Sequence, residues 1–111
     1  MPHVIRLRGA WRVQPAAMVG GVCFMRHFNR PTGLTSRTRV ALRFDRFDRP
    51  ADVTLNDAPL GSVPVGEGTT RLDVTRSLQL HNRLEIVVAA AEDADEPPGD
   101  VALVIDEGGD I

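Results

Sequence analysis

The sequence predicts an all-β domain built as an antiparallel β-sandwich. Apolar and polar residues alternate with a period of two along much of the chain, which is the pattern of half-buried strands. No window of about a dozen residues shows a helical repeat. Short apolar stretches recur at intervals of roughly ten residues, separated by Pro, Gly, Asn and Asp. A closed barrel would produce the same alternation and is the less favoured alternative.

The length of the chain restricts the number of domains. A chain of 111 residues hides roughly 65% of the surface that it exposes when unfolded, which leaves room for one core. We therefore expect a single domain over residues 1–111.

The first expected strands lie before residue 26. Ile5 and Leu7 alternate with arginines, and after Gly9-Ala10 the chain reaches Trp11. We expect Trp11 to be buried, and a sugar platform is the less favoured alternative. Residues 16–25, AAMVGGVCFM, are more apolar than a loop requires. We expect this segment to supply an additional strand or to form a subunit contact. A monomer in which Val19, Val22 and Phe24 are protected from solvent would instead favour ligand binding over association.

The later strands are expected where apolar residues alternate with polar ones. Their inward-facing residues should be Val40, Leu42 and Phe44; Val53 and Leu55; Leu72 and Val74; Leu84, Ile86 and Val88; and Val101, Leu103 and Ile105. The acidic segment 91–100, AEDADEPPGD, lies between the last two strands. We expect it to be a solvated loop, because its carboxylates lack the spacing of calcium ligands.

The stretch VTLNDAPLG at 53–61 is typical of a hairpin. Asn56 and Asp57 both tolerate a left-handed backbone, while Val53 and Leu55 alternate with a hydroxyl. We expect the hairpin to be scaffold. Further along, Asp73 and Thr75 are expected to satisfy backbone amides in the turn at 76–78.

Charge is distributed unevenly, and every cation is an arginine. Residues 1–50 contain ten arginines and two acids, whereas residues 51–111 contain three arginines and thirteen acids. The arginines alternate along expected strands and are not clustered with aromatics, so we expect cross-strand pairing and no nucleic-acid binding. The longest apolar run is too short to span a bilayer. We therefore expect no membrane partner. The single cysteine, Cys23, cannot form a disulfide within the chain and is expected to be buried, which favours a cytoplasmic location.

An ordered set of motifs resembles the sugar-binding domain of family-two glycoside hydrolases, the β-galactosidase and β-glucuronidase group. The likeness lies in residues 28–61, FNRPTGLTSRTRVALRFDRFDRPADVTLNDAPLG, and 69–88, TTRLDVTRSLQLHNRLEIVV. The matching positions are Phe28 and Pro31; Phe44 and Asp45; Leu55, Asn56 and Gly61; Asp73, Val74 and Thr75; and Asn82 to Glu85. The opening Leu7-Arg8-Gly9-Ala10-Trp11 and the ending Gly99-Asp100-Val101-Ala102-Leu103 are similar too, so the resemblance covers nearly the whole chain.

The resemblance implies a jelly-roll sandwich of the galactose-binding-like type. Asp57 stands where the family's hairpin has Gly, and we expect the hairpin to survive because Asp accepts a left-handed backbone. His81 stands where Gly is common, so its turn is expected to be differently shaped and to present the imidazole outward. In that family the catalytic carboxylates lie on a separate barrel domain.

Catalytic and metal-binding patterns are missing from the sequence. The three histidines are far apart, with no cysteine or carboxylate at a metal spacing. No serine lies in a Gly-x-Ser-x-Gly motif, and VGEGTT at 65–70 lacks the Lys-Ser/Thr of a phosphate loop. We expect no enzyme activity, no catalytic residue, no metal and no cofactor.

The expected function is therefore binding. Arg26, His27, Asn29 and Arg30, joined by His81, are the residues that we expect to hold a carbohydrate or glycan-like ligand. Aromatic residues are only 5% of the chain, which is little for a sugar platform. The alternative is a module that has lost sugar binding and acts as a homodimer or beside a protein partner.

Overall fold

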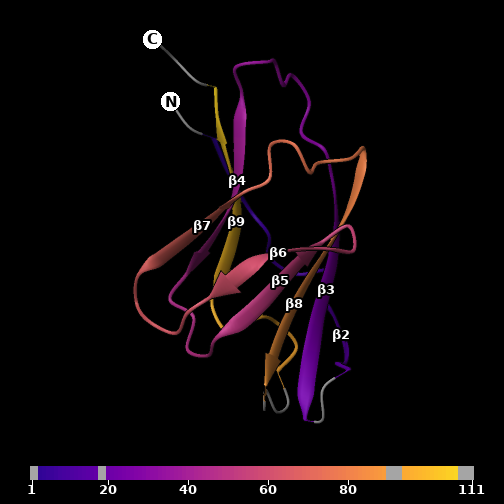
Figure 1. Cartoon of the computed structure of the whole chain (residues 1–111), viewed down its shortest axis with the longest axis vertical. Coiled ribbons are helices and arrows are strands. Elements are labelled where there is room, and N and C mark those ends of the chain that lie inside the picture. The colour runs from indigo at the N-terminus through magenta and orange to yellow at the C-terminus, as the bar shows by residue number, and fades with distance from the viewer. Residues whose placement is uncertain (1–2, 18–19, 90–93, 108–111) are drawn as a thin grey trace.

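The computed structural model describes residues 3–17, 20–89 and 94–107, which form two antiparallel sheets and no helix. In order across the first sheet lie β1 (His3–Arg6), β9 (Asp100–Asp106), β4 (Arg39–Asp45) and β7 (Thr69–Asp73). In order across the second sheet lie β2 (Arg12–Pro15), β3 (Gly21–Asn29), β8 (His81–Ala89), β5 (Ala51–Leu55) and β6 (Ala58–Val63). The predicted all-β antiparallel sandwich is confirmed (Figure 1).

The chain alternates between the sheets. Hairpins join β2 to β3 and β5 to β6, and the other connections cross from one sheet to the other. Strands that are neighbours in space are therefore mostly distant in sequence, as β3 and β8 are (Figure 1). Surface sites on either sheet must combine residues from separate parts of the chain.

The core lies between the two sheets and follows the predicted stripes. Its residues come from both sheets, and Phe24, Leu42, Val74, Leu84 and Ile86 have no exposed surface. At one end of the sandwich the rings of Phe44 and Phe47 pack edge to face, with centroids 5.7 Å apart. Burial of such side chains contributes roughly 25 cal/mol per Å² of apolar surface.

Two features of the four-stranded sheet differ from the simple alternating pattern. Ile5 lies on the core-facing side, opposite the buried Leu103, but is 43% exposed because β1 is an edge strand with a neighbour on one side only. In β9, five consecutive residues from Val101 to Ile105 are buried. Ala102 and Val104 belong to the outer face, and side chains of the flanking strands β1 and β4 cover them.

The apolar segment at 16–25 supplies an additional strand, which is the first of the two roles expected for it. Its second half begins β3, which lies between β2 and β8 in the five-stranded sheet. Phe24 is fully buried and Val22 is partly buried, while Val19 lies outside the described residues. Cys23 is buried on the outer face of the five-stranded sheet. Burial raises the pKa of its thiol, and the negative charge of Glu85 raises it further.

The hairpin between β5 and β6 has the turn that its sequence predicts. Asn56 and Asp57 have φ values of 52° and 70°, so both central residues are left-handed, as a type I′ turn requires. The expectation for Asp73 and Thr75 was wrong in detail. Asp73 accepts the amide of Thr75 at 2.8 Å, two residues on, and Thr75 Oγ1 instead accepts the amide of Val40 at 2.9 Å, tying the turn to β4.

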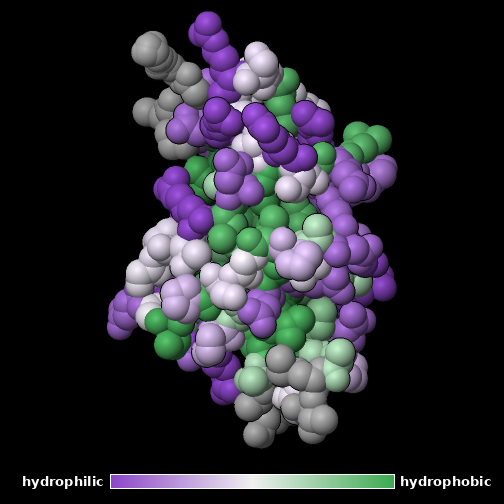
Figure 2. Space-filling view, in the orientation of Figure 1, coloured by the Kyte–Doolittle hydropathy of each residue, from purple (hydrophilic) through white to green (hydrophobic). Residues whose placement is uncertain are grey.

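Apolar and polar surfaces are unevenly arranged on the molecule. Apolar residues run through the middle of the face turned to the viewer, and charged residues surround them (Figure 2).

The described ranges contain no helix with the length and hydropathy that crossing a bilayer requires.

Candidate functional site

The structure brings together three of the five residues that the sequence singles out. β3 and β8 pair antiparallel, with His27 opposite Arg83 and Asn29 opposite His81. Residues directly opposite each other in paired strands share a face. Phe28 and Asn82 are buried between them, so His27, Asn29 and His81 lie on the outer face of the five-stranded sheet.

A direct contact joins His81 to Asn29. The Nδ1 atom of His81 lies 3.0 Å from the Oδ1 atom of Asn29, and both side chains are exposed. Because an amide oxygen only accepts, this contact selects the ring tautomer with the proton on Nδ1. The Nε2 atom is then free to accept a hydrogen bond, and the Asn29 amide group is free to donate one. The imidazole is presented outward, as expected.

These side chains border a shallow hollow of ≈ 320 Å³. It is lined by His27, Gln79, His81, Asn82 and Arg83, together with Asn56 and Asp57 at the tip of the β5–β6 hairpin. The Arg83 guanidinium pairs with Asp57 and lies 3.8 Å from Glu85, so it connects the hairpin tip to β8. The buried Nε atom of Arg83 has no hydrogen-bond partner among the described residues. The hollow thus offers donors and acceptors in an open, solvated setting.

Arg26 and Arg30 are placed differently. The Arg26 guanidinium donates to backbone carbonyls of Gly9 at 2.9 Å and of His27 at 3.2 Å, so it holds the loop before β2 against β3. Arg26 lies on the core-facing side of β3 with Phe24 and Phe28, and it does not line the hollow. Arg30 follows β3, is exposed and does not line the hollow either.

A second hollow adjoins the first and extends the surface toward β2. It is lined by Ala10, Trp11, Arg12 and His27, so His27 belongs to both hollows. We call the two together the His27 strip. It runs from Trp11 and Arg12 across His27 to His81, Arg83 and Asp57. The strip combines one aromatic side chain with a row of polar groups.

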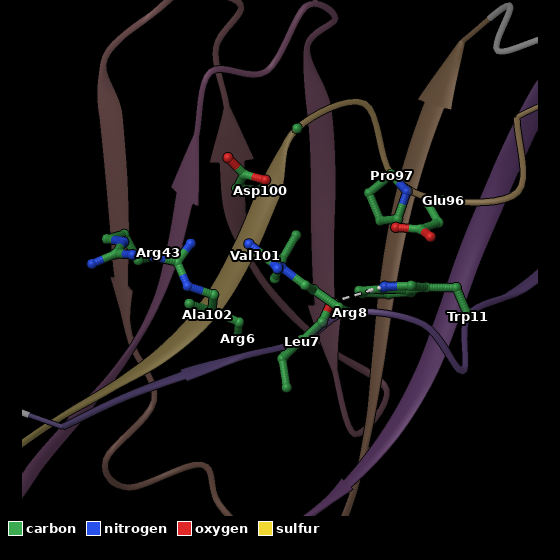
Figure 3. A pocket seen from close by; sticks show the side chains of 11 residues that line it. Arg6, Leu7, Arg8, Trp11, Arg43, Glu96, Pro97, Asp100, Val101 and Ala102 are labelled. Atoms are coloured by element: carbon green, nitrogen blue, oxygen red, sulfur yellow. Dashed lines mark hydrogen bonds between the residues drawn. The ribbon is translucent and has the colours of Figure 1, made fainter.

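Trp11 is only partly buried, which corrects the expectation that it is buried. Its Nε1 atom donates to the carbonyl of Leu7 at 3.0 Å, and the indole packs against the core cluster. The remaining surface lines the hollow with His27 and a small pocket on the opposite side. That pocket is ≈ 30 Å³, about the space of one water molecule. Figure 3 shows Trp11 beside Glu96 and Pro97 there, with Arg6, Arg43 and Ala102 at the other end.

Sequence reasoning missed most residues of the His27 strip, among them Arg12, Asp57 and Arg83, and it favoured the core over a sugar platform for Trp11. One signal was available, because Arg83 lies two residues after His81 and a strand places both on one face. Trp11 and Asp57 were treated as scaffold, and only the packing of the loop before β2 and of the hairpin tip shows that they also reach the surface.

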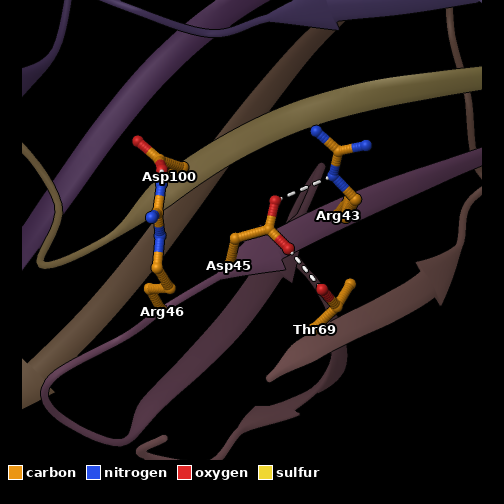
Figure 4. Close-up of polar contacts among 5 residues, drawn as sticks. All are labelled: Arg43, Asp45, Arg46, Thr69 and Asp100. Atoms are coloured by element: carbon orange, nitrogen blue, oxygen red, sulfur yellow. Dashed lines mark hydrogen bonds and ion pairs between the residues drawn. The ribbon is translucent and has the colours of Figure 1, made fainter. Parts of the chain in front are cut away.

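Two carboxylates on neighbouring strands of the four-stranded sheet are engaged by arginines. Asp45 and Asp100 lie opposite each other in β4 and β9. Asp45 accepts from Arg43 Nε at 2.9 Å and from the Thr69 hydroxyl, and Asp100 pairs with Arg46 at 3.0 Å (Figure 4). A glycosidase needs one carboxylic acid held protonated, whereas these two are engaged by arginines as in structural ion pairs. Among the described residues, no three His, Cys, Asp or Glu side chains are grouped to hold a metal.

Comparisons with solved structures identify the fold. The chain is similar to β-glucuronidase from Bifidobacterium dentium, with a TM-score of 0.74 and 20% identity over 94% of this chain and 30% of that one. It is similar to a Bacteroides uniformis β-glucuronidase, with a TM-score of 0.75 and 15% identity over 95% of this chain and 18% of that one. It is also similar to a putative β-galactosidase from Bacteroides fragilis, with a TM-score of 0.70 and 14% identity over 94% of this chain and 23% of that one.

These likenesses confirm the expected fold, a β-sandwich domain of the type found in family-two glycoside hydrolases. The chain spans less than a third of the length of each of these enzymes. No family model and no curated protein sequence matches the chain.

Proposed function

We propose that this domain is a non-catalytic binding module and that its ligand is a carbohydrate held on the His27 strip. The observation that supports this most is the combination of a partly exposed indole with outward-facing polar groups on one sheet face. Sugars present apolar faces that pack on aromatic rings, and hydroxyl groups that exchange hydrogen bonds with such side chains. The His81–Asn29 pair supplies both a free acceptor and a free donor.

The shape of the strip indicates weak binding. Both hollows are open, so a bound sugar would leave much of its surface in water, and loosely enclosed ligands gain little from burial. We expect binding in the millimolar range for a monosaccharide, and tighter binding for an oligosaccharide that reaches from His81 to Trp11.

Trp11 provides the test, because it is the lone tryptophan and the chain has no tyrosine. Indole emission is followed while methyl β-D-galactoside, methyl β-D-glucuronide and oligosaccharides containing the same sugars are added. Binding at the strip should change the emission with saturation. His81→Ala and Asn29→Ala should each weaken binding by about tenfold, since each removes one hydrogen-bonding group or its orientation.

The matched control is Ser62→Ala. Ser62 lies on the same sheet, level with Asp52 and Val87 and away from the His27 strip, and its hydroxyl bonds Asp52 at 2.8 Å. This variant should bind like the native protein. Absence of saturable binding by every probe, or equal binding by the His81 and Ser62 variants, would contradict a sugar site on this strip.

Protein interaction is the second candidate, and one observation favours it. β1 and β2 are edge strands of the two sheets, and they expose Val4 and Ile5 at 43% and Val13 at 44%. Edge strands with exposed apolar residues invite pairing with another chain. We expect a homodimer in sedimentation velocity at micromolar concentration, dissociated by Ile5→Arg. A native protein that sediments only as a monomer would remove self-association and leave ligand binding.

A further inference from the structure

Three arginines form a row across the outer face of the four-stranded sheet, opposite the sheet that holds the His27 strip. Arg6 pairs with Ala102, Ala102 pairs with Arg43, and Arg43 pairs with Arg71. Residues paired in this way point to the same face, and adjacent strands lie about 4.8 Å apart, so the row spans about 14 Å. We call these three residues the arginine row.

A row of like charges destabilises the sheet unless nearby negative charges offset it. Arg43 and Arg71 are directly opposite each other, and like charges in that position destabilise a sheet. Three carboxylates of these strands are already engaged, and Glu96 lies at the far end of the small pocket, beside Pro97 and Trp11 (Figure 3). Asp45 accepts from Arg43 and Thr69, Asp100 pairs with Arg46 (Figure 4), and Asp73 accepts the amide of Thr75.

The arginine row keeps unused hydrogen-bond donors. The guanidinium groups of Arg6 and Arg71 are exposed and make no hydrogen bond or ion pair to any other residue that the structure describes. Arg43 contacts Asp45 through Nε, and its two terminal amino groups have no partner in the same part of the chain. Between Arg6 and Arg43 lies Ala102, which is buried beneath the side chains of the flanking strands, so the outer surface of the row consists of arginine side chains.

The charges in the row select the kind of ligand. Asp45 offsets Arg43, which leaves two uncompensated positive charges on Arg6 and Arg71. A dianion would balance them, whereas chloride or a single carboxylate would not. The planar fork of a guanidinium matches the oxygen pairs of sulfate and phosphate, and hydrogen bonds between such ions are stronger than neutral ones.

We propose that the arginine row binds a tetrahedral dianion, sulfate or phosphate, either free or as an ester group on a larger molecule. The anion lies on the exposed surface of the row and receives hydrogen bonds from Arg6 and from the terminal amino groups of Arg43, while Arg71 supplies the second charge. This site is on the other sheet from the His27 strip and does not depend on sugar binding there.

The test is binding measured by calorimetry, supported by thermal unfolding. The protein is titrated with sodium phosphate, sodium sulfate and glycerol 3-phosphate, each against sodium chloride at the same ionic strength. A ligand that binds only the folded state raises the unfolding midpoint. We expect a higher midpoint in phosphate and sulfate than in chloride. Binding of glycerol 3-phosphate as tight as that of phosphate would identify an ester group as an acceptable source, and weaker binding would identify the free ion.

Variants separate the arginine row from general charge effects. Arg6→Gln and Arg71→Gln should each weaken phosphate binding by about tenfold or more, because each removes a charged donor. Arg37→Gln is the matched control, since Arg37 is an exposed arginine outside the sheet, before β4. It should bind phosphate like the native protein.

The variant Arg71→Gln distinguishes a binding role from a purely structural role of this arginine. Arg71→Gln relieves the repulsion with Arg43, so it should raise the unfolding midpoint in dilute chloride while it weakens phosphate binding. Equal midpoints of the native protein in phosphate and chloride would overturn the proposal. So would a loss of binding in Arg37→Gln as large as that in Arg71→Gln.

Discussion

The side-chain amide of Asn56 donates a hydrogen bond to the side-chain oxygen of Asn82 at 3.0 Å. This contact joins the tip of the β5–β6 hairpin to the start of β8. Asn82 also accepts the amide of Gln79 at 2.8 Å and donates to the carbonyls of Phe28 and Gln79 at 3.3 and 2.9 Å. Asn56 in turn accepts the amide of Arg83 at 2.9 Å. Two asparagines thus hold the backbone beneath the His27 strip.

Replacement of Asn82 should therefore destabilise the domain strongly. Asn82 is 1% exposed, so Asn82→Ala leaves buried amide and carbonyl groups without partners, and we expect a loss on the order of 3 kcal/mol. Chemical denaturation measures this loss. The matched control is Asn29→Ala, which removes an exposed asparagine from the neighbouring strand and should change stability by less than about 0.5 kcal/mol. Equal losses in the two variants would contradict the structural role of Asn82.

Gly99 should not tolerate a side chain. A Cβ atom built there would lie 2.6 Å from the carbonyl oxygen of Asp45 and 2.9 Å from that of Arg46, and closer still to the ring of Phe47. Gly99→Ala must displace backbone or a core ring, and we expect a loss of about 1–3 kcal/mol in thermal or chemical unfolding. Gly68→Ala is the control, because no described atom lies within 4 Å of its Cβ position. A Gly99 variant as stable as the Gly68 variant would show that the end of the sandwich adapts.

The stability of the domain should depend on the charge of Asp73. Its side-chain and backbone hydrogen bonds from Thr75 lower the pKa of Asp73 below the ordinary 3.8, and Arg39 and Arg76 lower it further. A depressed folded-state pKa contributes stability that is present above the unfolded value and is lost as pH falls through the folded value.

The variant Asp73→Asn keeps the accepting oxygen and removes the charge. It should be slightly less stable than the native protein near pH 7, and the difference should disappear as pH falls from 3.8 through the lowered folded-state pKa of Asp73. The effect is small because Asp73 is exposed and solvent screens it. Denaturant midpoints at several pH values measure it. A difference that persists unchanged into acid would contradict this origin.

The emission of Trp11 should be intermediate between buried and free indole. The ring packs on the core through one side, while its other surface lines the hollow with His27. We expect a partly blue-shifted native spectrum that moves to the red on unfolding, and moderate quenching by acrylamide. Emission already at the position of free indole in the native protein would contradict the packing and the Nε1 hydrogen bond to Leu7.

Much of the fold follows from the sequence by itself. The alternation through Val40, Leu42 and Phe44 determines which side of β4 is buried, because successive side chains in a strand point to opposite faces. Asn56-Asp57 determines the hairpin, because these residues accept the left-handed backbone of a type I′ turn. Both are local properties, which a short stretch of chain expresses without any partner.

The sites depend on the tertiary structure. His27 and Arg83 are 56 positions apart in sequence but opposite each other in β3 and β8 (83 − 27 = 56), and Arg6 shares a row with Arg43 and Arg71 only through β9. The order and register of strands arise from packing between distant segments, which the period of a single strand does not encode. The same packing turns the guanidinium of Arg26 onto backbone carbonyls and leaves His81 free to meet solvent.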